Sequence, residues 1–214
     1  MTSFSDLPEV ISLFPLPGAL LLPRARLPMH IFEPRYLALL DDCLKSDRRM
    51  IGMIQPRGDA VGAQPRLAQV GCAGRLTSFS EMEDGRYMVT VTGIIRFSVA
   101  EELTGFQPYR RARPDWTPFS GDLRHEEDEG FDRPVFLKML GKYFQTRKMG
   151  TDWASLKEAD TEMLVNALSM LCPFSVEEKQ ALLEAPTLVQ RRMTLETLIS
   201  FALQRGGSSD EVLQ

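Results

Sequence analysis

The residues of this chain best suited to acid–base chemistry are its two histidines, His30 and His125. Nucleophilic catalysis by a serine or a cysteine would need one of them as the base. His125 begins the acidic run His125–Glu129, which we expect to be a solvated linker and therefore a poor place for a rigid base, with metal binding as the minor alternative. His30 precedes an expected helix start at Pro34, where a polar structural role and a functional pocket both stay open.

The motifs that hold a nucleotide or activate a serine nucleophile do not occur in the sequence. There is no G-x-x-x-x-G-K-[ST] loop for a triphosphate and no G-x-S-x-G elbow, and the run 71–74 is not a dinucleotide fingerprint. Cys43, Cys72 and Cys172 match no metal or redox spacing, so we interpret them as small buried hydrophobes in a reducing compartment. We therefore expect no catalytic residue, no cofactor and no metal site.

The single compact basic cluster is Arg110-Arg111-Ala112-Arg113. On a strand, Arg111 and Arg113 would share one face while Arg110 points away. Two interpretations of this cluster stay open. It is either a solvated strand edge or a contact for nucleic acid or an acidic peptide. The formal net charge of -4 and the pI of about 5.4 argue against nucleic acid as the partner, because binding by bulk electrostatics needs a basic face.

These residues must be positioned by two kinds of structure, since the pattern changes near residue 120. Before it, short apolar runs broken by proline predict about six or seven strands, with one helix beginning at Pro34. Asp84-Gly85 between two strand-like runs predicts a hairpin, and residues 57–65 predict a loop. The expected strands cover residues 10–16, 19–27, 50–54, 67–79, 86–97, 97–103 and 109–116.

After residue 120 the pattern is helical. Asp132 with Pro134, and Ser175 with Glu178, predict helix starts, and Gly206-Gly207 predicts the end of the last helix. Two apolar stripes are expected to face the core. Their members are Val135, Phe136, Met139, Leu140, Tyr143 and Phe144 in the first, and Met163, Leu164, Ala167, Leu168 and Leu171 in the second. We expect subdomains at residues 1–120 and 121–205, with a disordered tail at 206–214.

The start of the chain and its longest apolar run bear on its location. Residues 1–6 lack a basic region before an apolar stretch, and the run 18–23 is too short to span a bilayer. We therefore expect a soluble, cytoplasmic protein with no membrane contact.

The stretch from Phe14 to Leu44 resembles the opening of Lon N-terminal domains, especially the stand-alone bacterial form. The string His-Ile-Phe-Glu-Pro-Arg-Tyr at residues 30–36 is its most specific part. Further matching segments lie at residues 51–54, 70–74, 84–87, 93–97, 108–110, 173–174 and 178–185. The resemblance covers nearly the whole chain.

The resemblance implies an α+β fold, namely a PUA-like β-barrel of about six strands and one helix followed by a C-terminal helical bundle. It also implies a non-catalytic module that binds protein or peptide substrates, and it leaves open a separate ATP-dependent protease as a further partner. In full-length Lon the ATPase and Ser-Lys peptidase modules come later, and because this sequence stops at Gln214 we expect neither. The family motif supplies no catalytic residues to transfer.

The candidate binding region combines the string at 30–36 with the basic cluster. A carboxylate at Glu33 suits the positive end of a helix dipole, and Arg35 is expected to pair with a carboxylate elsewhere. Two other functions stay open, an RNA-binding PUA-like module and a small-molecule sensor with a pocket near His30. The candidate residues are His30, Phe32, Glu33, Arg35, Tyr36, Arg111 and Arg113.

Overall fold

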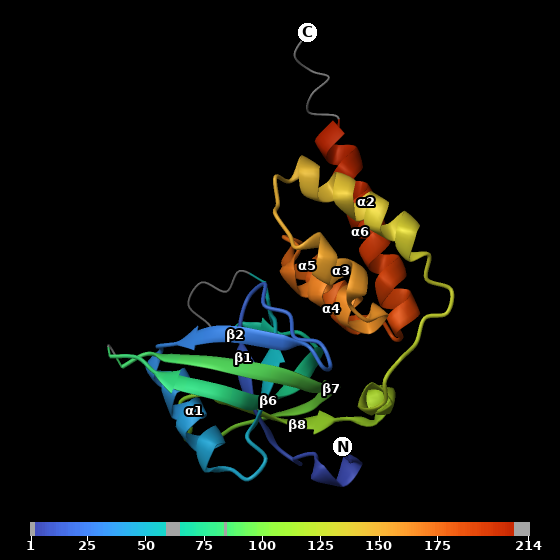
Figure 1. Cartoon of the computed structure of the whole chain (residues 1–214). Helices are drawn as coiled ribbons and strands as arrows, with labels where there is room; N and C mark the ends of the chain where they lie inside the picture. The colour runs from blue at the N-terminus through green and yellow to red at the C-terminus, as the bar shows by residue number, and fades with distance from the viewer. Residues whose placement is uncertain (1–2, 59–64, 84, 208–214) are drawn as a thin grey trace.

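The computed structural model describes residues 3–58, 65–83 and 85–207. A sheet-rich part lies below and helices α2 to α6 gather above it, with α1 at the lower left (Figure 1). In chain order the elements are η1 (Phe4–Asp6), β1 (Ile11–Pro15), β2 (Arg26–Ile31), α1 (Pro34–Lys45), β3 (Met50–Ile54), β4 (Pro56–Arg57), β5 (Arg66–Leu67), β6 (Val70–Glu81), β7 (Tyr87–Leu103), β8 (Arg110–Asp115), η2 (Thr117–Leu123), α2 (Arg133–Thr146), α3 (Trp153–Glu158), α4 (Thr161–Leu171), α5 (Val176–Glu184) and α6 (Leu188–Gly207).

Six strands form the main sheet in the order β2-β7-β6-β3-β1-β8, and β8 also pairs with β7. β1 and β3 are parallel, whereas β6 and β7 form a long antiparallel hairpin that ends in the pairing of Glu81 with Tyr87. The expected hairpin is therefore confirmed, although Asp84 itself lies outside the described residues. The expected strands at 86–97 and 97–103 are one continuous strand, because the 17-residue β7 pairs with β2 over residues 87–92, with β6 over 87–98 and with β8 over 98–103.

The segment between β1 and β2 does not form the strand expected from residue 19. Pro23 offers no N–H to a ladder, and Arg24 adopts a left-handed φ of 64°, so pairing starts only at Arg26. The segment crosses β7 at Gly93, whose N–H donates to the carbonyl of Ala25 at 2.9 Å. A Cβ at Gly93 would overlap the backbone carbonyl of Leu22, so this crossing requires glycine.

The helix starts follow the local signals. Pro34 is in the first turn of α1, the Asp132 carboxylate accepts from the Val135 N–H at 3.1 Å, and Ser175 with Glu178 forms both bonds of a capping box. The structure adds α3, which the apolar pattern did not reveal. This helix is only six residues long and is capped by Asp152.

The larger hydrophobic core crosses from the sheet to the helices. It joins Leu21 and Met53 of the sheet part to Leu164 and Leu182 of the helical part, so the two parts bury apolar surface against each other. A smaller core lies inside the sheet part around Phe97, whose ring meets Trp116 edge-on at 5.7 Å. In the two expected apolar stripes, three members face solvent. Val135, Met163 and Leu171 are 63%, 65% and 75% exposed.

The acidic run after residue 124 is solvated only in part, because Glu127 and Glu129 are exposed whereas Glu126 and Asp128 have partners. The Asp128 carboxylate pairs with Arg192 and is only 2% exposed, and the Glu126 carboxylate accepts from the N–H of Leu188. His125 contacts Glu162 at 2.8 Å. The run packs on the beginning of α6 because unpaired N–H groups and an arginine there attract carboxylates.

The loop expected at 57–65 lies mostly outside the described residues, and its two ends are the short strands β4 and β5. The last helix continues through Gly207, so two residues assigned to the tail are helical, and residues 208–214 lie outside the described residues. No helix in the described part of the chain has the length and apolarity to cross a membrane.

The three cysteines yield a first prediction. All three are free and buried, and burial raises the thiol pKa of Cys43 and Cys172 to about 11 and raises that of Cys72 further. Because the thiolate is the reactive form, we expect negligible reaction with a disulfide reagent in the folded protein and three reactive thiols after denaturation. Measuring released chromophore over time tests this. A thiol that reacts in the folded chain as fast as free cysteine would contradict it.

Candidate functional site

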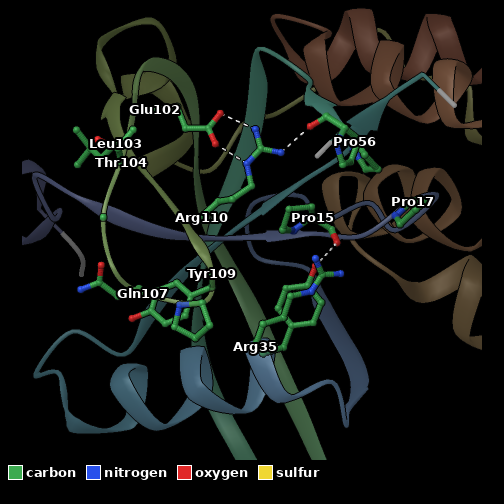
Figure 2. A pocket seen from close by; sticks show the side chains of 14 residues that line it. Pro15, Pro17, Arg35, Pro56, Glu102, Leu103, Thr104, Gln107, Tyr109 and Arg110 are labelled. Carbon is green, nitrogen blue, oxygen red and sulfur yellow. Dashed lines mark hydrogen bonds and ion pairs between the residues drawn. The ribbon is translucent and has the colours of Figure 1, made fainter. Parts of the chain in front are cut away.

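Two of the candidate residues, Arg35 and Tyr36, line a cavity of about 510 Å³ on the sheet part, here called the β1–α1 pocket. It lies where β1 ends, α1 begins and the segment between β7 and β8 passes (Figure 2). Its lining residues are Pro15, Pro17, Arg35, Tyr36, Pro56, Pro65, Glu102, Leu103, Thr104, Gly105, Gln107, Pro108, Tyr109 and Arg110.

Tyr36 forms the inner wall of the β1–α1 pocket. Its ring stacks on Phe14 at 4.1 Å between centroids, and its hydroxyl donates to the carbonyl of Pro15 at 3.1 Å. Burial raises the pKa of this phenol, so it stays a neutral donor. The Arg35 guanidinium lies 4.5 Å from the centroid of the Tyr36 ring and pairs with Glu33 at 2.8 Å. Arg35 was expected to pair with a carboxylate elsewhere, but its partner is Glu33, two positions before it in the chain.

Arg110 forms the opposite wall. Its guanidinium makes a two-pronged pair with Glu102 and donates to the carbonyl of Pro65 at 2.6 Å (Figure 2). Such a planar bidentate pair holds both side chains in place and neutralises their charges. Both arginines of the pocket therefore already have carboxylate partners.

Tyr109 connects the pocket to α1, and it yields a second prediction. Burial and a hydrogen bond from its hydroxyl to the Asp42 carboxylate raise the Tyr109 pKa to about 12. The folded state favours the neutral phenol, so this contribution to stability is present below pH 10 and is lost as the pH rises to 12. Between pH 10 and pH 12, we expect the free energy of unfolding, measured by urea titration, to fall less in Tyr109→Phe than in the unmodified chain. Equal losses would contradict the assignment.

The β1–α1 pocket is lined by rigid apolar groups and by a few fixed polar ones. Five prolines supply the apolar walls, and the polar groups include Glu102 and Arg110, which hold each other in place. Across the described residues, no group of three metal-ligating side chains gathers. A cavity with apolar walls and a few fixed polar groups is typical of a binding site.

The structure divides the candidate residues into separate locations. Arg35 and Tyr36 line the β1–α1 pocket, while Glu33 stands at its rim through the pair with Arg35. His30 and Phe32 are exposed at the end of β2, where His30 lies opposite Met88 on β7. They do not line the pocket.

The two arginines chosen from the basic cluster do not line the pocket, although the Arg111 guanidinium lies beside Gly105, which does. Arg113 is exposed and pairs with Glu101 at 3.4 Å, and Arg111 is half-buried. Arg110 is the member that lines the pocket. The alternation of side chains along β8 could have indicated this. Arg110 shares a face with the fully buried Ala112, so its side chain leaves the strand on the inner side. No local sequence pattern indicates that Pro15, Pro65 and Glu102 also line the pocket.

Comparisons with known proteins agree on one family. The family model described as the substrate-binding domain of the ATP-dependent protease La (LON) matches residues 10–200. Lon protease 2 of Myxococcus xanthus is 27% identical over 210 residues, covering 90% of this chain and 24% of that protein. Lon protease 2 of Sorangium cellulosum is 28% identical over 158 residues, covering 73% of this chain and 17% of that protein. The chain thus spans at most about a quarter of the length of these two relatives.

Two solved structures share the fold. The N-terminal domain of a Mycobacterium avium complex Lon protease superposes with a TM-score of 0.63 at 16% identity, covering 89% of this chain and 98% of that chain. A Lon N-terminal domain protein from Xanthomonas campestris gives a TM-score of 0.59 at 22% identity, covering 90% and 98%. These likenesses establish a mixed α+β fold of the Lon N-terminal type.

Proposed function

This chain belongs to the family of Lon substrate-binding domains, and we propose that it holds polypeptide segments of other proteins for proteolysis or quality control without performing catalysis itself. The observation that carries the proposal is the β1–α1 pocket, with its proline and tyrosine walls. An extended segment can place apolar side chains between such walls while backbone groups meet the polar rim.

The charges of the pocket favour a polypeptide over a nucleic acid. Arg110 is neutralised by Glu102 and Arg35 by Glu33, so neither is free to release counterions by pairing with phosphate. The exposed Arg113 is likewise paired with Glu101. A sensor site beside His30 has less support, because His30 lies on an exposed strand face outside the pocket.

The pairing of β8 with both β1 and β7 supports a PUA-like β-barrel, and the five helices from α2 to α6 support an appended bundle, with the boundary near residue 120. Three free buried cysteines support a reducing compartment, the cytoplasm. A separate ATP-dependent protease is the partner that would consume a held segment.

A binding titration tests the proposal. Fluorescently labelled, permanently unfolded α-lactalbumin, reduced and carboxymethylated, is titrated with the chain and its anisotropy is followed. Leu103 is half-buried at the pocket wall, so Leu103→Glu places a charge where an apolar side chain would bind. We expect it to weaken binding by about tenfold, the loss of one apolar anchor in a recognition pocket. Leu171→Glu is the matched control, because Leu171 is already exposed on α4 and lies outside the pocket.

The outcomes separate the alternatives. Equal binding by Leu103→Glu and the unmodified chain would refute the pocket as the site. Binding of a labelled RNA oligonucleotide in place of the unfolded protein, with loss in Arg111→Glu, would favour the RNA-binding reading instead.

A further inference from the structure

A second cavity, of about 530 Å³, lies on the helical part between α2 and α3. We call it the α2–α3 groove and define it by Lys138, Gly141, Phe144, Lys148, Trp153 and Lys157. It shares no residue with the β1–α1 pocket. It is therefore a separate surface from the one that carries the function proposed above.

The floor of the groove is built around Trp153. Its ring packs against Phe144 at 5.8 Å between centroids and remains 36% exposed. A Cβ at Gly141 would meet the indole at 3.7 Å, so the missing side chain leaves the aromatic surface open along α2. Asp152 fixes this arrangement, because its carboxylate caps α3 by accepting from the N–H groups of Ala154 and Ser155 at 3.0 and 3.3 Å.

The rim of the groove is positively charged. Lys138, Lys148 and Lys157 are all exposed, and none of them forms an ion pair within the described part of the chain. No acidic residue is among the groove's lining. Lys148 reaches this place through a left-handed φ of 52° at the turn that follows α2, a conformation that costs free energy in a residue other than glycine.

The combination selects a ligand by its chemistry. Unpaired lysines around an aromatic floor complement a chain that carries several carboxylates next to one apolar side chain. RNA also offers negative charge and stacking, but the chain as a whole has a formal net charge of -4, which repels a polyanion beyond the groove itself. A short acidic protein segment avoids that repulsion because it contacts only the groove.

We propose that the α2–α3 groove docks an acidic segment of a partner protein, with an aromatic or aliphatic side chain of that segment lying on Trp153. The three lysines pair with its carboxylates. The groove is thus a second protein-binding surface, on the opposite part of the molecule from the β1–α1 pocket.

The test uses a short fluorescein-labelled peptide in which Asp and Glu residues flank a single Phe. Binding is followed by anisotropy and by the emission of Trp153, since the other tryptophan, Trp116, is buried at 8% exposure. We expect binding to weaken by about tenfold at low salt in the triple variant Lys138→Gln, Lys148→Gln, Lys157→Gln. Each exposed ion pair lost between a lysine and a peptide carboxylate should weaken binding by about a few-fold. Lys142→Gln is the matched control, an exposed lysine on the same helix outside the lining. It should bind as the unmodified chain does.

Two more observations complete the test. Trp153→Phe must abolish the emission change, and binding must weaken as salt increases. The proposal is overturned if the triple variant binds as well as Lys142→Gln. It is also overturned if a peptide with Asn and Gln in place of the acids binds equally well, or if an RNA oligonucleotide displaces the peptide more strongly than unlabelled peptide does. The unfolded-protein titration with Leu103→Glu probes the other surface, so the two proposals fail independently.

Discussion

Replacing Asp122 with alanine is expected to lower the free energy of unfolding by about 3–5 kcal/mol, because it leaves a buried arginine without its counter-charge. The Arg96 and Asp122 side chains are 2% and 3% exposed, and their closest atoms lie 2.7 Å apart. Arg96 also donates to the carbonyls of Leu183 and Ala185, at 3.0 and 2.5 Å. One buried pair thereby ties β7 to η2 and to the end of α5.

Urea unfolding, followed by circular dichroism and by tryptophan fluorescence, measures the effect. The matched control is Glu101→Gln, which breaks the exposed pair with Arg113 and should cost less than about 1 kcal/mol. Since Arg96 spans both parts, we expect Asp122→Ala to shift the helical and the sheet signals together. A loss for Asp122→Ala no larger than that for Glu101→Gln would show that the buried pair is dispensable.

Replacing Gly93 with alanine is expected to cost about 3 kcal/mol or more, at the upper end of overpacking effects. The new Cβ would overlap the backbone carbonyl of Leu22, which cannot move aside as a flexible side chain can. The overlap would push the segment before β2 away from β7. It would also strain the hydrogen bond from the Arg24 N–H to the Gly93 carbonyl, which is 2.8 Å long.

Gly121→Ala is the matched substitution, since nothing lies within 4 Å of a Cβ built at that position. It should change stability by less than about 0.5 kcal/mol. Thermal unfolding of the two variants side by side gives the comparison. Similar melting temperatures for both would mean that the crossing at Gly93 relaxes more easily than its geometry indicates.

The residues that these two predictions concern account for part of the family resemblance in physical terms. The stretch Gly93–Phe97 contains the glycine at the chain crossing, the buried Arg96 and Phe97 at the centre of the smaller core. Its residues hold the fold together and do not line the β1–α1 pocket. A family motif of this kind reports structure as much as function.

The local features of the chain could be predicted from the sequence. Helix starts at Pro34, Asp132 and Ser175 depend on hydrogen bonds within three or four residues, so the residues that make them are neighbours in the sequence. The hairpin between β6 and β7 follows in the same way from turn residues between alternating strands. Motif matching over most of the chain also identified the family.

The candidate site needed tertiary structure. Its pocket joins Pro15, Arg35, Glu102 and Arg110, which meet only because β1 pairs with β8 and α1 packs beside them. The burial of Asp128 in the acidic run depends on tertiary structure for the same reason, since its partner Arg192 lies 64 residues further along the chain. Sequence periodicity shows which side of an element is apolar, but not which distant charge will cover a carboxylate. Only the packing of the two parts against each other decided where those charges meet and which surfaces stayed open to bind.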